Sequence, residues 1–237
     1  MKLASFCLLF SIASLLPARA DLTIVQKVEG GIRENGQMTI KIKGAKARIE
    51  ATPQITTIVD TKTGEMTQVM NDQKMVVRIS PEKMKAAMET LSKFSGKQES
   101  AMQSKLIATG KKEAINGYET EQYVYETPSF KATYWIAPKY PNASAILKQL
   151  EVLNSGAWKP KDVPMLSYTD FPGVPIKSVV TVNGNEITTT VTAIKEDSLS
   201  DSEFTVPKDF QEVKSPEMKL EPTQNETTPA GGASPKP

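Results

Sequence analysis

Apolar and polar residues alternate along the chain between residues 22 and 80. Residues 38–43 and 46–51 each place an apolar side chain at every second position, opposite lysine, arginine, threonine or glutamate. One apolar face and one solvent-exposed polar face are typical of antiparallel strands. Turn-forming pairs such as Gly30-Gly31, Asn35-Gly36 and Asn71-Asp72 divide the stretch into short pieces. We therefore predict an up-and-down sheet of about six strands in this part of the chain.

The period of the pattern then changes from two to between three and four. Ser80 is a suitable N-cap, Pro81 suits the first turn, and Glu82 lies near the positive end of the helix dipole. Apolar side chains recur with helical spacing up to Phe94, and Gly96 ends the pattern. The sequence predicts a helix over 81–94 that packs with its apolar stripe against the sheet.

Strands and a second helix are predicted in the rest of the chain. Asn116-Gly117 and Asn183-Gly184 are turn sequences, and the second pair supplies the two positive-φ positions of a type I′ hairpin turn. Residues 158–175 combine prolines with large apolar side chains, so we expect a covering loop there. The predicted strands are 106–113, 118–126, 130–137, 174–182 and 186–195, and the predicted helix is 142–154.

The two ends of the chain differ from the part between them. Lys2 precedes an uncharged run over 3–16, and the small residues Ala18 and Ala20 have the spacing that a signal peptidase reads. The run is too short to span a bilayer, so we predict a signal peptide cleaved after Ala20 and a periplasmic or secreted bacterial protein. Lipidation of Cys7 is the less favoured alternative, because Phe6 precedes it and the apolar run continues beyond it.

The C-terminal composition predicts a tail without a core. Residues 215–237 are rich in proline, threonine, glycine and serine, and such a segment cannot bury enough apolar surface to offset its chain entropy. We predict a disordered tail there, with a spacer toward the cell wall or a partner as the alternative. The chain is thus divided into a signal peptide (1–20), a single domain (21–214) and a tail (215–237).

Charge and composition exclude several classes of function. The chain has 29 basic and 27 acidic side chains, and the signal carries Lys2 and Arg19 but no acid, which leaves 27 of each. A neutral chain gives no electrostatic reason for binding nucleic acid. It has no histidine, and its only cysteine is Cys7. Without these nucleophiles and metal ligands, and without a nucleotide-binding motif, we expect no enzyme, no catalytic residue, no cofactor and no metal site.

The order of several short motifs resembles a known bacterial family. These motifs are Ile115-Asn116-Gly117-Tyr118-Glu119-Thr120-Glu121-Gln122-Tyr123, Tyr134-Trp135-Ile136-Ala137, Gly173-Val174-Pro175-Ile176-Lys177 and Phe204-Thr205-Val206-Pro207-Lys208-Asp209-Phe210. In this order, on an exported chain with a strand meander and a helix, they resemble domain of unknown function 4412 over nearly all of 21–213. That family is similar to the lipoprotein-carrier superfamily of LolA and LolB.

The resemblance implies a fold more strongly than a function. It implies a mainly β, α+β fold: a curved antiparallel half-barrel of about ten to eleven strands with two or three covering helices, as in LolA and LolB. In those carriers the concave face encloses an apolar cavity that holds acyl chains. None of the four motifs transfers an individual binding residue from the carriers to this chain.

Two groups of residues are candidates for lining such a cavity. One is a stripe on the first helix with methionines of the preceding strands, and the other is a pair of aromatic residues on a later strand. Ordinary core packing and cross-strand aromatic pairing are the alternatives, and we favour them for both groups. The candidates are Met84, Met88, Leu91, Phe94, Met70, Met75, Tyr134 and Trp135.

The function expected from these features is a non-enzymatic, exported binding module. It would hold or transfer a lipid or another apolar ligand in a helix-lidded cavity. The alternative is an envelope protein-interaction or structural scaffold with a filled core. The expected partners are accordingly a lipid, acyl chain or lipoprotein, or an envelope protein, with no nucleic acid and no transmembrane segment.

Overall fold

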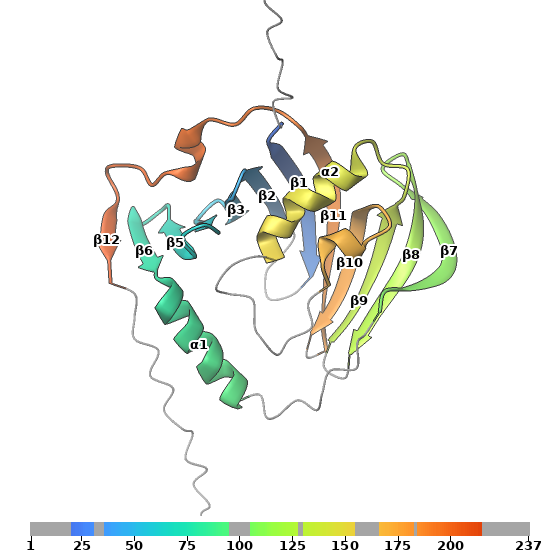
Figure 1. The fold of residues 1–237 in the computed structure, drawn as a ribbon, viewed down its shortest axis with the longest axis horizontal. Helices are drawn as coiled ribbons and strands as arrows, with labels where there is room; N and C mark the ends of the chain where they lie inside the picture. The colour runs from blue at the N-terminus through green and yellow to red at the C-terminus, as the bar shows by residue number, and fades with distance from the viewer. Residues whose placement is uncertain are drawn as a thin grey trace, which may run out of the picture.

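A single curved β-sheet forms most of the molecule (Figure 1). The computed structural model describes residues 20–30, 36–94, 105–127, 130–154, 166–182 and 184–214. The twelve strands lie in the order β12-β6-β5-β4-β3-β2-β1-β11-β10-β9-β8-β7, so β12 and β7 are the two edges of an open sheet. All neighbouring strands are antiparallel except β12 and β6.

Six strands precede the first helix, as the alternation predicts. They are β1 (Leu22–Gly30), β2 (Gly36–Lys43), β3 (Lys46–Thr52), β4 (Ile55–Asp60), β5 (Glu65–Met70) and β6 (Met75–Ile79). After α1 (Pro81–Phe94) come β7 (Ile107–Ile115), β8 (Tyr118–Thr127), β9 (Phe130–Ala137), α2 (Ala143–Leu150), β10 (Val174–Val182), β11 (Asn185–Lys195) and β12 (Gln211–Val213). Three short 3₁₀ helices are η1 (Glu151–Asn154), η2 (Tyr168–Asp170) and η3 (Asp201–Phe204).

Register defines an inner, concave face and an outer face of the sheet. Residues paired directly across antiparallel strands point to the same side, and neighbours along a strand point to opposite sides. One continuous row on the inner face runs through Leu22, Ile42, Ala47, Val59, Met66 and Ile79. A second row runs through Ile24, Ile40, Ile49, Thr57, Gln68 and Val77. The apolar alternation in the sequence is therefore the lining of the concave side.

Four register shifts help the sheet to curve. They lie at Val25/Gln26, Glu50/Thr52, Pro175/Lys177 and Ala108/Lys112. A β-bulge bends its strand and increases the local twist, which lets a wide sheet wrap around a central space.

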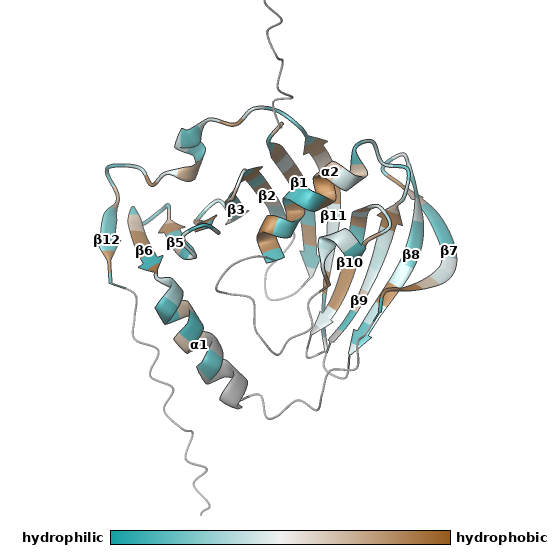
Figure 2. Cartoon of the chain, viewed as in Figure 1, coloured by the Kyte–Doolittle hydropathy of each residue, from teal (hydrophilic) through white to brown (hydrophobic). Residues whose placement is uncertain are grey.

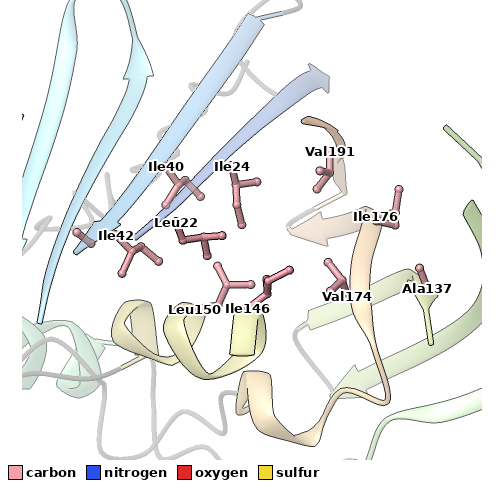
Figure 3. Packing of buried hydrophobic residues seen from close by; sticks show 11 residues of the cluster. Leu22, Ile24, Ile40, Ile42, Ala137, Ile146, Leu150, Val174, Ile176 and Val191 are labelled. Atoms are coloured by element: carbon pink, nitrogen blue, oxygen red, sulfur yellow. The ribbon is translucent and has the colours of Figure 1, made fainter. Parts of the chain in front are cut away.

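The second helix fills one end of the concave side (Figures 1 and 3). The side chains of Ile146 and Leu150 point from α2 toward Leu22, Ile42 and Val174 on three strands, and all five are buried. The helix begins after Asn142, whose left-handed backbone (φ 55°) turns the chain into it. This cluster is the main hydrophobic core of the described residues, and Figure 2 shows hydrophobic stretches on α2 and on the strands around it.

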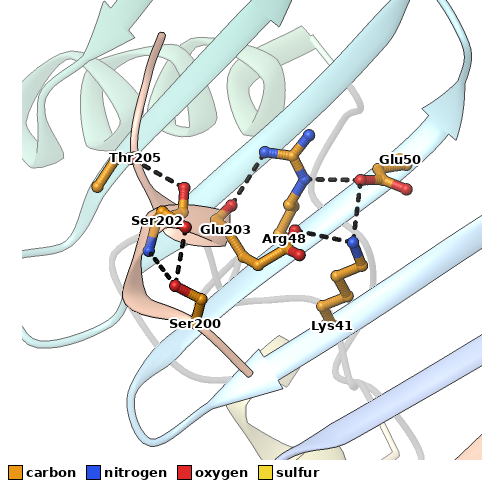
Figure 4. Close-up of polar contacts among 7 residues, drawn as sticks. All are labelled: Lys41, Arg48, Glu50, Ser200, Ser202, Glu203 and Thr205. Carbon is orange, nitrogen blue, oxygen red and sulfur yellow. Dashed lines mark hydrogen bonds and ion pairs between the residues drawn. The ribbon is translucent and has the colours of Figure 1, made fainter. Parts of the chain in front are cut away.

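A polar clasp holds the segment before β12 on the outer face (Figure 4). The Arg48 guanidinium donates to the Glu203 carbonyl at 2.9 Å and to the Glu50 carboxylate at 2.7 Å, and the Lys41 ammonium donates to the Glu203 carboxylate at 2.9 Å. Next to the clasp, Phe204 packs on Ile58 and the outer faces of β5 and β6. The segment over 198–210 therefore covers an apolar patch that the outer face would otherwise expose.

The architecture agrees with the half-barrel expected from the sequence, but its details differ in three ways. The sheet has twelve strands rather than ten or eleven, because the three-residue β12 adds a parallel edge to β6. The described residues contain two α-helices, and of these it is α2 that lies across the sheet. The predicted helix over 81–94 forms with those bounds, but it continues from the end of β6 and extends beyond the sheet instead of packing across it (Figure 1).

The N-terminal signal segment and the C-terminal tail, predicted over 1–20 and 215–237, lie almost entirely outside the described residues. The division of the chain into these parts and a single domain therefore stays a prediction.

Candidate ligand-binding face

The inner face continues past α2 as a surface rich in methionine. A third row of the sheet begins with the directly paired Gln26 and Met38, is interrupted by the bulge in β3, and resumes with Ile55, Met70 and Met75. Met66 lies on the same face in the first row, and Gln68 of the second row lies between it and Met70. We call Met38, Ile55, Met66, Met70 and Met75 the methionine surface. All five are partly buried, and of these five only Met38 packs against a core cluster of the described residues.

The methionine surface suits an irregular apolar ligand. Methionine is unbranched and polarisable, so it adapts to ligands of varied shape at little energetic cost. Met70 and Met75 are direct cross-strand partners on β5 and β6, which keeps their side chains adjacent. The sequence selected both residues, and the register brings them together on the concave side.

Aromatic side chains form the opposite wall of the concave side. Tyr134 on β9 is paired with Tyr123 on β8, and Tyr125 lies next along β8 on the same face. Phe171 covers Tyr134 edge-on, with ring centroids 5.0 Å apart, and Tyr168 stacks on Phe171 at 5.8 Å. Tyr134 therefore lies on an inner aromatic wall, and Phe171 and Tyr168 of the following loop cover it.

The loop over 166–171 is fixed to η1, the 3₁₀ helix that follows α2. The Glu151 carboxylate accepts from the Ser167 hydroxyl at 2.9 Å and from the Tyr168 backbone N–H at 2.8 Å. The Asn154 amide donates to the Leu166 carbonyl at 2.8 Å. These bonds place Tyr168 and Phe171 over β9, where a covering loop was predicted; residues 158–165 of that prediction lie outside the described part.

Burial changes the acidity of the covered tyrosine. Desolvation raises the pKa of Tyr134 to about 12, with smaller contributions from the nearby Tyr168 and Tyr125. Its hydroxyl therefore stays neutral across the physiological range. The wall formed by these aromatic residues is uncharged.

Trp135, the neighbour of Tyr134, lies on the other side of the sheet. It is paired with Lys177 and Gln122, and the Lys177 ammonium lies 4.7 Å from the centre of its ring. Alternation along β9 therefore separates the two aromatic residues that the sequence proposed together. The structure brings Trp135 to the outer face, away from the concave side.

The helix stripe is described only in part. Met84 is partly buried on α1, whereas the side chains of Met88, Leu91 and Phe94 lie outside the described part of the structure. Their role as cavity lining stays a prediction.

Sequence reasoning missed one inner residue, Gln26. Its carbonyl oxygen Oε1 is the one buried side-chain polar atom of the described residues that lacks a hydrogen-bond partner. It lies between Val191 and Met38 in the register of β1 with its two neighbours. The signal was present in the sequence, because Gln26 interrupts the inward positions Leu22, Ile24 and Val28 with a polar side chain.

A separate cleft of about 330 Å³ opens on the β7–β8 hairpin. Its lining includes Lys112, Glu119, Glu121 and Lys139, and the Lys112 ammonium pairs with the Glu121 carboxylate at 2.8 Å. With Glu113, the lining of this cleft has three glutamates and two lysines, and none of the predicted site residues lines it.

Two further findings concern the chemistry of the described residues. Within those ranges there is no group of three or more acids, histidines or cysteines placed to hold a metal ion. No helix in the described part is long and apolar enough to cross a membrane.

The sequence matches the profile of the family described as "Domain of unknown function (DUF4412)" over residues 24–210. The chain belongs to this family, as the order of its motifs suggested. Comparison with curated protein sequences finds no match.

The solved structures that this chain matches are distant in sequence. A PNGF-II structure shares 13% identity with a TM-score of 0.37; the match covers 83% of this chain and 31% of the PNGF-II chain, so this chain spans less than a third of that protein. The lipoprotein LppX of Mycobacterium tuberculosis shares 10% identity with a TM-score of 0.41, covering 78% of this chain and 91% of LppX. A LolA superfamily protein of Nitrosomonas europaea, NE2245, shares 8% with a TM-score of 0.31, covering 79% and 91%.

Proposed function

We propose that this protein is an exported, non-enzymatic binding module that holds or transfers an apolar ligand on the concave side of its half-barrel. The observation that carries the proposal is the methionine surface, which continues the inner rows of the sheet beyond the core under α2. A concave apolar surface with adaptable side chains is typical of a site for a lipid or a similar molecule. Export is inferred from the N-terminal signal-like segment.

The absence of histidine and of cysteine outside the N-terminal segment supports a binding role over catalysis. The charged side chains of the N-terminal strands also point away from the proposed site. Lys41, Arg48 and Glu50 are engaged with one another and with Glu203 on the outer face. A ligand on the inner face would meet none of these groups.

The alternative is a structural scaffold of the envelope, and the packing of α2 favours it. Ile146 and Leu150 are buried in the core cluster at one end of the concave side. If the inner face of β4 to β6 were filled by packing in the same way, no room for a ligand would be left.

Ligand retention separates the two functions. The protein should be purified gently from the envelope of its own cells and examined by native mass spectrometry, and the emptied protein should be titrated with N-phenyl-1-naphthylamine, an uncharged fluorescent apolar probe. A binding function predicts a co-purifying lipid mass and a saturable fluorescence signal. Met70→Glu should abolish both signals. Glu126→Gln, which removes one member of an exposed ion pair between β8 and β9, is the control and should leave both signals unchanged. A protein that is always empty and does not bind the probe would be a scaffold.

A further inference from the structure

The inner face of the described strands from β6 to β9 carries no formal charge. Its polar members are neutral amides and hydroxyls, whereas the acids, lysines and arginines of these strands occupy the alternate, outward positions. The neutral polar members, apart from residues at the strand ends and bulges, are Gln26, Gln68, Thr57, Thr189, Ser178 and Tyr134. A charged ligand group placed there would lose its water without gaining an opposite charge.

The unpartnered oxygen of Gln26 lies on this face at the border between two regions. On one side, Val191 belongs to the core under α2, and on the other, Met38 begins the methionine surface. A buried acceptor without a donor costs free energy, and a native protein that retains one invites an explanation. A ligand with an O–H or N–H group would satisfy this oxygen.

The row of inner residues that begins at Gln26 also offers a path for the apolar chain of the ligand. From β1 to β6 it passes Met38, Ile55, Met70 and Met75 and crosses five inter-strand steps. At about 4.8 Å a step, the row spans about 24 Å, a length suited to an extended long hydrocarbon chain.

We propose that the concave face binds an uncharged long-chain amphiphile. Its hydroxyl or amide N–H group donates to Gln26 Oε1, and its chain lies along the methionine surface toward β6. This inference rests on the proposed function and narrows it from apolar ligands in general to neutral ones with a hydrogen-bond donor. An ionised fatty acid, which has a charge and only acceptors, is disfavoured.

Three probes with the same hydrocarbon chain separate these properties. Equilibrium binding of radiolabelled 1-monooleoylglycerol, methyl oleate and oleate should be measured on the full chain at mildly alkaline pH, where oleate is ionised. Monooleoylglycerol is neutral with donors, methyl oleate is neutral without a donor, and oleate is charged. We expect affinity to fall in that order, with about a tenfold advantage of monooleoylglycerol over methyl oleate.

Substitution of the acceptor tests the role of Gln26 directly. Gln26→Leu should remove the advantage of monooleoylglycerol over methyl oleate while raising the midpoint of thermal unfolding, because a buried unsatisfied oxygen is lost. Gln37→Leu, on the outer face of β2 and opposite Lys27, is the matched control and should leave the ranking unchanged.

The outcomes distinguish this inference from the proposed function. Equal binding of all three probes, or an unchanged ranking in Gln26→Leu, would overturn the inference and leave the binding function intact. Binding of none of the probes would overturn both.

Discussion

At the scale of single residues, the inner face of the described strands from β6 to β9 is distinguished by its lack of formal charge, whereas on β8 the same face carries Glu121. The alternation of each strand sends Lys41, Arg48 and Glu50 outward, and burial keeps the Tyr134 phenol neutral. Such a surface selects ligands by shape and hydrogen bonding rather than by charge. The one buried polar side-chain atom of the described residues without a partner, Gln26 Oε1, lies where that selection would act.

The raised pKa of Tyr134 predicts a loss of stability at alkaline pH. A tyrosine that ionises at about 10 when unfolded and at about 12 when folded favours the folded state fully below pH 10. This contribution is lost as the pH rises from 10 to 12, because the unfolded state then releases its proton first. The spectrophotometric titration of Tyr134→Phe should lack one phenol that ionises near pH 12, and its alkaline loss of stability should be shallower. If the lost phenol ionises near pH 10 instead, the hydroxyl is not buried.

At the scale of elements, two parts of the same face differ in how they are covered. Strands β1 and β2 pack under α2, whereas the inner positions of β5 and β6 form the methionine surface. The outer face has its own cover, since the segment with η3 is held there by the clasp of Lys41, Arg48, Glu50 and Glu203. The core under α2 and the clasp therefore stabilise the half-barrel, whereas β5 and β6 present the surface proposed to bind the ligand.

Truncation of one residue from each part tests this division. Ile146→Ala removes a fully buried side chain from α2 and should lower the free energy of unfolding by about 2–5 kcal/mol. Met70→Ala removes a partly buried side chain and should lower the free energy of unfolding by less than about 2 kcal/mol, because the side chain is not enclosed by a packed core and its removal leaves no cavity. Urea unfolding of both variants measures the difference. Equal losses would show that the methionine surface is ordinary core.

The outer clasp predicts a dependence on acid. The hydrogen bond from Lys41 lowers the pKa of Glu203 below its ordinary value of 4.5, against a smaller opposing effect of burial. Its contribution to stability is therefore present above pH 4.5 and is lost as the pH falls through the lowered pKa of the folded state.

Glu203→Gln isolates this contribution. The midpoint of thermal unfolding of the variant should fall less steeply with acidification than that of the natural protein. Glu126→Gln, which removes an exposed partner of Lys131, serves as the control and should follow the natural curve. A Glu203→Gln curve parallel to the natural one would mean that the clasp does not depend on this carboxylate.

At the scale of the whole molecule, the sequence predicted much of the architecture because its periods are clear. Six strands before residue 80, the helix over 81–94 and the hairpin of β10 and β11 follow from alternation, an N-cap and turn residues. The edge strand β12 could not be predicted, because three residues give no period and its pairing with β6 depends on a contact distant in the sequence. The position of α1 beyond the sheet was missed for a related reason: an amphipathic stripe predicts burial without naming the partner.

The sequence could name candidate site residues on the strands, but their arrangement depends on which face of the sheet each side chain lies on. The sequence named Met70 and Met75 as candidates without their register, and the register makes them direct partners on one face. Tyr134 and Trp135 were treated as one group, although neighbours on a strand point apart. Gln26 was missed because a polar residue in an apolar strand reads as a solvent-facing position until the register shows otherwise.

Methyl NMR of the methionines tests most directly whether the concave side binds an apolar ligand. The protein should be labelled at the methionine methyl groups, the signals assigned by single Met→Leu substitutions, and 1-monooleoylglycerol and oleate added in separate titrations. A binding role predicts that the signals of Met38, Met70 and Met75 shift in a saturable manner with at least one of the two ligands, since these residues share one row of the inner face. Signals that remain in place at saturating concentrations of both would contradict a binding role for this surface.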